Sequence, residues 1–355
     1  MKNSRPHRNT HCRIRDYVWR GHRCISMENE ILRAVFCADK GSDLLELTYK
    51  PTDTELMWQS ARGLADVHDA PSSPLSSGQF RDLFPGGWYV MLPNGPKPCQ
   101  HRGAEYGFHG EATFLRWDVN IEEDTPESIT VVFSTRLRRT PVHMERRISL
   151  SKGSGTLVFD ETISSDAAQS VEVLYGHHPC FGAPFLEPGC KLFLPPCRAT
   201  IGDLAPESSR YQPRQIAQWP MLKGLKNEMI DASILPGPES NSNEFIVLDE
   251  FSDSWAALVN PNRDLGFALR WDAKVFPIFG FWQVLGGGDD YPWYGSEYIV
   301  ALEPACALPS LAEAVQDGTA IVLQPQTSLS TRLEATLFTD VRHVSAVKPE
   351  GVIVR

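Results

Sequence analysis

The chain has 355 residues, of which 42% are hydrophobic and 22% charged, proportions that are typical of globular proteins and argue against wholesale disorder. Lys and Arg number 34 and Asp and Glu number 44, so the formal net charge is −10. Such an acidic chain offers no electrostatic basis for binding nucleic acid through its phosphates. No run of about 18 apolar residues occurs, so we expect no membrane partner either.

The N-terminal stretch is basic and polar and lacks the apolar region of a secretory signal. We therefore expect residues 1–20 to form a flexible tail and the protein to be cytoplasmic. The chain has eight cysteines, but its size makes stabilising disulfides unnecessary, so reduced thiols are expected. Cys190 and Cys197 flank a short apolar run, which leaves a local disulfide between them open.

Alternation of apolar and polar residues with a period of two predicts strands with one buried face over 129–137, 267–271 and 329–337. Shorter apolar runs predict more deeply buried strands over 245–248, 255–259, 298–302 and 320–323. Turn signals rich in Gly or Pro separate these segments at 152–155, 261–262 and 286–289.

Only one short helix is predicted, over Leu311–Gln316. Ser310 can cap it, Glu313 lies three residues further as in a capping box, and Gly318 can end it. Many short strands without a βαβ rhythm predict an all-β fold, a large antiparallel β-sandwich or barrel. Residues 21–345 are expected to form a single domain.

The first segment with candidate chemistry spans residues 80–97 and 106–117. His109 lies between Phe108 and Gly110, and a glycine beside a histidine lets a ligand approach closely. Trp88 and other aromatic residues nearby could stack on a sugar ring. The alternative is a bend in a strand whose histidine is hydrogen-bonded in the core.

The second segment, residues 171–185, contains an alternating strand that breaks at Gly176 and is followed by His177 and His178. Strand ends and their loops commonly display catalytic groups. Adjacent residues of an extended chain point to opposite sides, so at most one of the two histidines is expected to face a given pocket.

The third segment, residues 279–311, includes Trp282 and places Glu303 at the end of an apolar strand, just before Pro304. Burying a lone carboxylate is costly, so it must be paired, protonated or functional. Burial also raises a carboxyl pKa toward the value that suits a general base. The structural alternative is a strand-end salt bridge.

Together these segments offer one carboxylate and several histidines at strand ends among aromatic residues, a set that suits acid–base chemistry on a polar ring without a cofactor. A metal site remains an alternative, because His109, Glu111 and either His177 or His178 could supply ligands. No H-x-H pair occurs, and we expect no metal. No phosphate-binding glycine loop and no G-x-S-x-G motif are present.

At these segments the chain resembles the aldose 1-epimerase (galactose mutarotase-like) superfamily. The ordered features are a glycine-containing strand pair within 28–58, an HG motif at His109 shortly before a Trp, an H-P-x-F motif that begins at His178, and a strand ending in Glu303 followed by Pro. The likeness extends over roughly residues 25–340. It implies a β-supersandwich, consistent with the alternating pattern.

The resemblance also implies residue roles. Glu303 would be the general base that takes the anomeric hydroxyl proton, and His178 the general acid that protonates the ring oxygen. His109 would hold the sugar by hydrogen bonds. One acid and one base suffice, so neither a cofactor nor a metal is implied.

Further substrate contacts are expected from Arg81, the nearest counterpart of a sugar-binding arginine, and from His177, Trp88, Asp249 and Trp282. The chain departs from the family pattern in placing His177 where an Asn is usual and Cys180 where a Tyr is common.

The sequence thus favours an isomerase that interconverts sugar anomers and acts as a monomer or homodimer on a monosaccharide. A non-catalytic carbohydrate-binding protein on the same scaffold and a metal-dependent sugar isomerase or lyase are the alternatives. The acidic net charge disfavours an anionic sugar, although local charge can override it.

Overall fold

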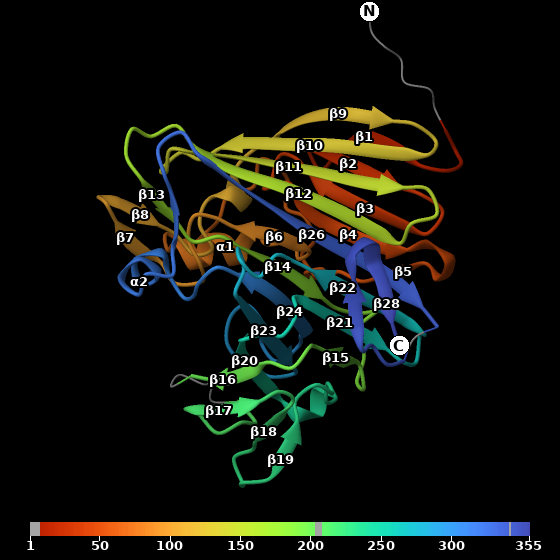
Figure 1. Cartoon of the computed structure of the whole chain (residues 1–355), viewed down its shortest axis with the longest axis vertical. Coiled ribbons are helices and arrows are strands. Elements are labelled where there is room, and N and C mark those ends of the chain that lie inside the picture. Colours follow the sequence, from red (N-terminus) through yellow and green to blue (C-terminus); the bar gives the residue numbers. More distant parts are fainter. Residues whose placement is uncertain (1–7, 203–207, 341) are drawn as a thin grey trace, which may run out of the picture.

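The structure, a computed structural model, describes residues 8–202, 208–340 and 342–355. Two large antiparallel sheets lie face to face, with β10–β12 over β1–β4 in the upper half of Figure 1 and β16–β19 at the lower end. The predicted all-β sandwich is confirmed.

The larger sheet has twelve strands. In spatial order its main path runs through β1 (Arg13–Trp19), β2 (His22–Glu28), β3 (Leu32–Cys37), β4 (Asp43–Tyr49), β6 (Trp88–Met91), β14 (Gly176–Phe181), β24 (Tyr298–Ala305), β23 (Ile278–Leu285), β20 (Ser242–Asp249), β16 (Arg198–Ile201) and β17 (Gln215–Gln218). The short strand β5 (Thr54–Glu55) pairs with β4 beside this path.

The second sheet has eight strands, in the order β15 (Lys191–Phe193), β21 (Trp255–Asn260), β22 (Leu265–Arg270), β26 (Ser328–Thr339), β12 (Thr156–Ser165), β11 (Val142–Ser151), β10 (Ser128–Arg136) and β9 (Asp118–Asp124). Four two-stranded sheets complete the described strands: β7 (Cys99–His101) with β8 (Ala104–Tyr106), β13 (Val171–Val173) with β25 (Ile321–Leu323), β18 (Met221–Lys223) with β19 (Met229–Asp231), and β27 (Ala346–Lys348) with β28 (Val352–Val354).

The main core lies between the two sheets. Phe36 of β3 meets Phe133 of β10 with ring centroids 5.5 Å apart, and Phe181 of β14 meets Phe267 of β22 at 4.7 Å. The alternating segments predicted as strands over 129–137, 267–271 and 329–337 form β10, β22 and β26, and their apolar residues enter this core. The predicted strands are confirmed. A single buried face is wrong for β22, because Ala268 on its other face packs in a separate cluster with Phe193 and Trp255.

The central strands of the larger sheet are covered on both faces. In β24, Val300 and Leu302 enter the core between the sheets, whereas Ile299 and Ala301 join a second apolar cluster beneath helix α1 (Ser76–Leu83). Residues buried on both faces give a continuous apolar run rather than an alternating one. The deep burial predicted for 298–302 is therefore confirmed.

Deep burial is also confirmed for 255–259 in β21, whose residues are all buried. The prediction of deep burial is wrong for the segments 245–248 and 320–323. In β20 buried and half-buried residues alternate, and in β25 Val322 is exposed. The reason for β25 is that it belongs to a two-stranded sheet, with one face left open.

The predicted helix is confirmed as α2 (Leu311–Gln316). The Ser310 side chain accepts a hydrogen bond from the backbone N–H of Glu313 at 3.3 Å, and Gly318 follows with a φ of 71°. Helix α1 was not predicted, because its eight residues include only one buried side chain, Phe80, and so show no apolar stripe.

The predicted tail over residues 1–20 is wrong for Arg13–Trp19, which form β1 and pair with β2. Residues 1–7 lie outside the described residues. At the other end, β27 and β28 continue past the expected boundary at residue 345, and Val347 packs in a cluster with Phe193 and Trp255.

All eight cysteines are free thiols, so Cys190 and Cys197 are not joined. Within the described ranges, no helix combines the length and the apolar character needed to cross a membrane.

Candidate active site

A cavity of about 590 Å³ lies over the face of the larger sheet that is turned away from the second sheet. His109, His178 and Glu303 line it, and its walls are mainly aromatic, formed by Trp58, Phe80, Phe84, Phe108, Trp282 and Trp293. This size, and a few polar groups within apolar walls, are typical of small-molecule sites.

Strand register brings the polar groups together. In the pairing of β14 with β6, His178 lies opposite Tyr89, and in that of β23 with β24, Gly280 lies opposite Glu303. The register of β14 against β24 puts His178 opposite Glu303. Directly opposite residues share a sheet face, so these four residues form one row across four strands.

His178 and Glu303 form the centre of this row. Nε2 of His178 lies 3.2 Å from Oε1 of Glu303, and both side chains are almost fully buried. The two atoms are not aligned for a hydrogen bond, and Oε1 has no hydrogen-bond partner among the described residues. A buried carboxyl oxygen without a partner is costly, so this atom is placed to bond a ligand.

Burial sets the protonation of the pair. It raises the pKa of Glu303 from 4.5 to about 8 and lowers the pKa of His178 from 6.5 to about 3, because it disfavours the charged form of each group. Between these values the pair holds one proton, and in the empty cavity that proton resides on Glu303. One member is thus always a proton donor and the other an acceptor.

Two neighbours fix the His178 ring. Its Nδ1 lies 3.1 Å from Sγ of Cys180, and the Tyr89 ring stacks on it with centroids 4.7 Å apart and planes at 18°. Burial raises the pKa of the Cys180 thiol well above its ordinary value, so the thiol keeps its proton and can donate it to Nδ1. This contact directs Nε2 toward Glu303.

His109 reaches the cavity from an unusual backbone. Its φ is 61°, and Nδ1 lies 2.8 Å from the Tyr89 hydroxyl. The next residue, Gly110, has a φ of 76°, and a Cβ there would lie 2.3 Å from the carbonyl oxygen of Leu92. Only glycine fits this approach. Burial lowers the pKa of His109, and repulsion from His178, when that ring is protonated, and from Arg81 lowers it further, so the His109 ring stays neutral.

The remaining wall leaves room for the carboxylate. A Cβ on Gly280 would lie 3.2 Å from Cβ of Glu303. Trp282 lies two residues beyond Gly280 on the same face of β23. Its ring centroid is 5.9 Å from that of His178 and 5.5 Å from that of Trp293. Arg81, from the last turn of α1, also lines the cavity. Five of the predicted site residues are thus brought together: Glu303, His178, His109, Arg81 and Trp282.

His177 lies elsewhere, which corrects its predicted contact with substrate. It points into the core between the sheets, where Nε2 lies 3.0 Å from Oε2 of Glu161 and Nδ1 accepts a hydrogen bond from Nε1 of Trp88 at 3.2 Å. The same bond holds Trp88, which is fully buried and does not line the cavity, so its predicted role is corrected too.

Asp249 is also outside the cavity, although its side chain lies on the same face of β20 as Phe245, which lines the cavity. Phe245 of β20 lines the cavity, but Asp249 lies four residues further along the strand, about 13 Å away at a rise of about 3.3 Å per residue. There its carboxylate is 2.7 Å from the guanidinium of Arg198. The prediction of a substrate contact is corrected by this pairing.

The alternative metal ligands do not converge. The carboxylate of Glu111 accepts hydrogen bonds from the backbone N–H groups of Arg138 at 2.9 Å and Arg139 at 3.0 Å, away from His109. Over the described ranges, no group of three or more His, Cys, Asp or Glu side chains is placed to hold a metal ion.

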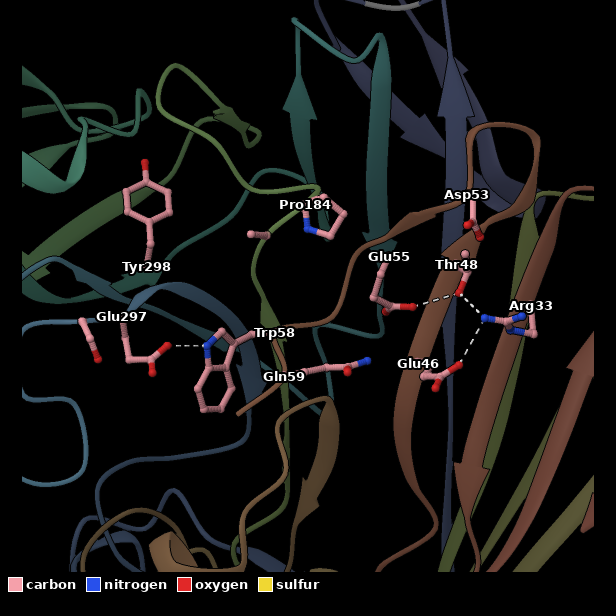
Figure 2. Close-up of a pocket in the computed structure, with 12 residues that line it drawn as sticks. Arg33, Glu46, Thr48, Asp53, Glu55, Trp58, Gln59, Pro184, Glu297 and Tyr298 are labelled. Carbon is pink, nitrogen blue, oxygen red and sulfur yellow. Dashed lines mark hydrogen bonds and ion pairs between the residues drawn. The ribbon is translucent and has the colours of Figure 1, made fainter. Parts of the chain in front are cut away.

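A second hollow, of about 560 Å³, shares Trp58 with the cavity (Figure 2). Its polar side chains bond one another: Thr48 donates to Glu55 at 2.9 Å, and Arg33 lies 3.3 Å from Glu46. On the other side, Trp58 donates its Nε1 hydrogen to Glu297 at 2.8 Å. Each of these carboxylates thus has a partner, and the described residues that line the hollow include no histidine that could form a pair like that of the cavity.

Sequence reasoning missed Tyr89, Cys180 and Arg62 as parts of the site. All four residues of β6 are buried, so no polar alternation showed that Tyr89 rather than Trp88 faces the cavity. Arg62 lies in a loop, and its position depends on contacts with Arg81 and Tyr291 that no local pattern reveals.

Comparison with known proteins agrees with this architecture. A family described as a domain of unknown function, DUF4432, matches residues 19–337. No protein of curated function matches the chain.

Three solved structures show the same fold. A Klebsiella pneumoniae protein provisionally named an aldose 1-epimerase has a TM-score of 0.72 and 16% identity, over 90% of this chain and 80% of its own. An Escherichia coli K12 protein provisionally given the same name has a TM-score of 0.61 and 13% identity, over 88% and 98%. A galactose mutarotase-like protein from Lactobacillus casei has a TM-score of 0.58 and 16% identity, over 89% and 100%. The predicted resemblance is confirmed at the level of the fold.

Proposed function

The chain belongs to the DUF4432 family, and from the geometry of its cavity we propose that it is an aldose 1-epimerase-type isomerase that interconverts the anomers of a free sugar. The observation that carries this proposal is the His178–Glu303 pair, whose facing atoms are 3.2 Å apart in one buried cavity. In a cyclic sugar the anomeric and ring oxygens share one carbon atom, so a proton acceptor and a proton donor side by side match the two atoms that must exchange protons.

Ring opening moves two protons. The Glu303 carboxylate takes the proton of the anomeric hydroxyl, and the His178 imidazolium gives its proton to the ring oxygen. The bond from the anomeric carbon to the ring oxygen breaks, and a carbonyl forms at that carbon. Rotation about the adjacent carbon–carbon bond then presents the other face of the carbonyl. On ring closure the attacking hydroxyl gives its proton to His178, and Glu303 gives its proton to the new anomeric oxygen.

The single proton that His178 and Glu303 share is consistent with this cycle. Ring opening leaves Glu303 protonated and His178 neutral, which is the form that burial favours in the empty cavity. Hydrogen bonds from sugar hydroxyls would stabilise the carboxylate and transfer the single proton to His178. Both forms of the pair therefore occur in each turnover, and no proton must enter from solvent.

The aromatic walls support a sugar substrate. Trp282 and Trp293 lie 5.5 Å apart and border the pair, and indole rings pack well against the apolar face of a pyranose. His109 offers a neutral ring as a hydrogen-bond partner for a hydroxyl group.

The test is the rate of approach to anomeric equilibrium, followed by polarimetry or NMR, after dissolving α-glucose or α-galactose with and without protein. We expect catalytic acceleration by the wild type and a loss of roughly two to four decades in Glu303→Gln, which keeps the size of the side chain but not the base. If Glu303→Gln retains more than about a third of the rate, Glu303 is not the base. Sugar binding without acceleration would identify a carbohydrate-binding protein instead.

A further inference from the structure

Two guanidinium groups line the cavity, those of Arg62 and Arg81. The Arg81 guanidinium carbon lies 5.4 Å from the centroid of the Phe108 ring. Arg62 donates a hydrogen bond from Nη2 to the main-chain oxygen of Arg81 at 2.9 Å, and its guanidinium carbon lies 6.0 Å from the centroid of the Tyr291 ring. These contacts hold both arginines in the wall of the cavity, with the Arg62 guanidinium bonded to the main chain of Arg81.

Within residues 8–202, 208–340 and 342–355, Arg62 and Arg81 make no ion pair. The contacts of their guanidinium groups are with the Phe108 ring, with the ring and hydroxyl of Tyr291, and with a carbonyl oxygen. The adjacent Asp82 carboxylate is occupied by the hydroxyl of Tyr291 and by Ser72, whose backbone N–H donates at 2.8 Å. Most of the other arginines of the chain are paired with a carboxylate, so an unpaired couple beside a cavity points to a ligand that supplies the negative charge.

Among the residues that the structure describes, Glu303 is the only acidic one that lines the cavity. Burial raises its pKa to about 8, which leaves it largely neutral at pH 7 in the empty cavity. The cavity is therefore locally positive, although the chain has a net charge of −10. Because the surrounding walls are apolar, these charges are screened less than in water and attract an anion more strongly. Local charge of this kind can override the expectation from net charge that anionic sugars are disfavoured.

Two rings in contact, those of Phe108 and His109, link Arg81 to the acid–base pair. From Arg81 the contacts run through the Phe108 ring to the His109 ring at 4.0 Å, and from there to the His178 ring at 5.3 Å, between ring centroids. A monosaccharide with its anomeric carbon at Glu303 and His178 would extend its other end toward Arg81 and Arg62.

We propose that the substrate is a monosaccharide with an anionic group, a carboxylate or a phosphate, at the end remote from its anomeric carbon, and that Arg62 and Arg81 bind this group. The inference rests on the proposed function, because the His178–Glu303 pair fixes which end of the sugar is anomeric. Guanidinium groups suit both anions, since each can accept two parallel hydrogen bonds from one arginine.

The test compares kcat/KM for anomer interconversion of glucose, glucuronate and glucose 6-phosphate, measured by NMR exchange. We expect at least one of the two anionic sugars to be preferred over glucose by about tenfold or more, the scale of one charge-assisted hydrogen bond. Which of the two is preferred identifies the anion. Arg62→Gln and Arg81→Gln should each reduce this preference by about tenfold or more, and 0.5 M NaCl should weaken it.

The control is Arg136→Gln, which removes an exposed arginine of β10 in the second sheet, where it is paired with Asp166. It should leave the preference unchanged. A wild-type preference of about one, or a preference that survives both cavity substitutions, overturns the inference and leaves the proposed function standing.

If the protein accelerates none of the three sugars, the proposed function fails, and calorimetric binding of the same sugars decides the inference. Tighter binding of an anionic sugar that is lost in Arg81→Gln supports the anion site. Binding of glucose and the anionic sugars with equal affinity, or binding of none of them, overturns it.

Discussion

His177 and His178 are neighbours in the chain, yet their side chains serve different parts of the molecule. Nε2 of His178 lies 3.2 Å from Glu303 in the cavity, whereas Nε2 of His177 lies 3.0 Å from Glu161 between the two sheets. Alternation along β14 separates them, because successive side chains of a strand point to opposite faces. One histidine lies in the cavity and the other in the core between the sheets.

Substitution of each histidine by Asn should therefore have different effects. His178→Asn should lower the rate of anomer interconversion by about two to four decades with little change in stability. His177→Asn should leave the rate of the folded protein within about threefold but lower the free energy of unfolding by about 1–3 kcal/mol, because Glu161 loses a buried partner. Exchange rates and denaturant titrations of both variants check this. A large rate loss in His177→Asn with unchanged stability would move the acid to His177.

The sequence predicted much of this arrangement, and the limits have physical causes. The alternating segments identified strands, and a carboxylate after an apolar run drew attention to Glu303. The expectation that it ends the strand is wrong, because pairing with β23 continues to Ala305. The alternation of side chains along a strand showed that His177 and His178 face opposite sides. Which side meets the cavity depends on how the two sheets pack, and their strands come from segments far apart in the sequence. Asp249 lies on the face of β20 that borders the cavity. The sequence pattern does not show, however, at which position along the strand the cavity lies.

The rate of interconversion should depend on pH through the shared proton of the pair. Burial places the pKa of Glu303 at about 8 and that of His178 at about 3, so the pair holds one proton between these values. We expect a plateau from about pH 5 to 7.5 and a fall approaching tenfold per pH unit above about pH 8, where the pair loses this proton. A rate that still rises between pH 8 and 10 would contradict a donor–acceptor pair with one proton.

Stability should also report the buried Glu303. Its pKa in the folded protein, about 8, exceeds the ordinary value of 4.5, so the native state binds more protons than the unfolded state between these values. Stability from this group is present below about pH 4.5 and is lost as the pH rises through 8. Glu303→Gln removes the ionisable group and should raise the melting temperature relative to wild type by about 2 °C or more at pH 9, with a smaller difference at pH 4.5. Thermal unfolding at both pH values checks this; an equal difference at the two values would show that ionisation of Glu303 does not oppose folding.

Cys180 should act as a positioning residue for His178. Its Sγ lies 3.1 Å from Nδ1 of His178, so Cys180→Ala removes the group that fixes the ring and the tautomer. We expect kcat to fall by about tenfold while KM changes little, since the substitution loses one hydrogen bond to the acid rather than a substrate contact. Cys180→Ser, which restores a donor, should recover most of the rate. A rise in KM at constant kcat, or no recovery by Ser, would show that the thiol only fills space.

Gly110 should be required for the placement of His109. Its φ of 76° disfavours any side chain, and a Cβ would also lie 2.3 Å from the carbonyl oxygen of Leu92. Gly103 provides a matched control, because it has a φ of 78° but no atom within 4 Å of its Cβ position. Both Gly→Ala substitutions impose the left-handed backbone on alanine, at a cost of about 1 kcal/mol, but only Gly110→Ala adds a clash with the backbone.

We therefore expect Gly103→Ala to lose slight stability and no activity. Gly110→Ala should be less stable still, and should raise KM by about tenfold because the His109 ring shifts away from the Tyr89 hydroxyl, 2.8 Å from its Nδ1. Thermal unfolding and steady-state kinetics of the two variants separate backbone strain from the clash. If both variants have the same KM as wild type, the backbone at Gly110 does not position His109 for the sugar, and the glycine is required only for packing against Leu92.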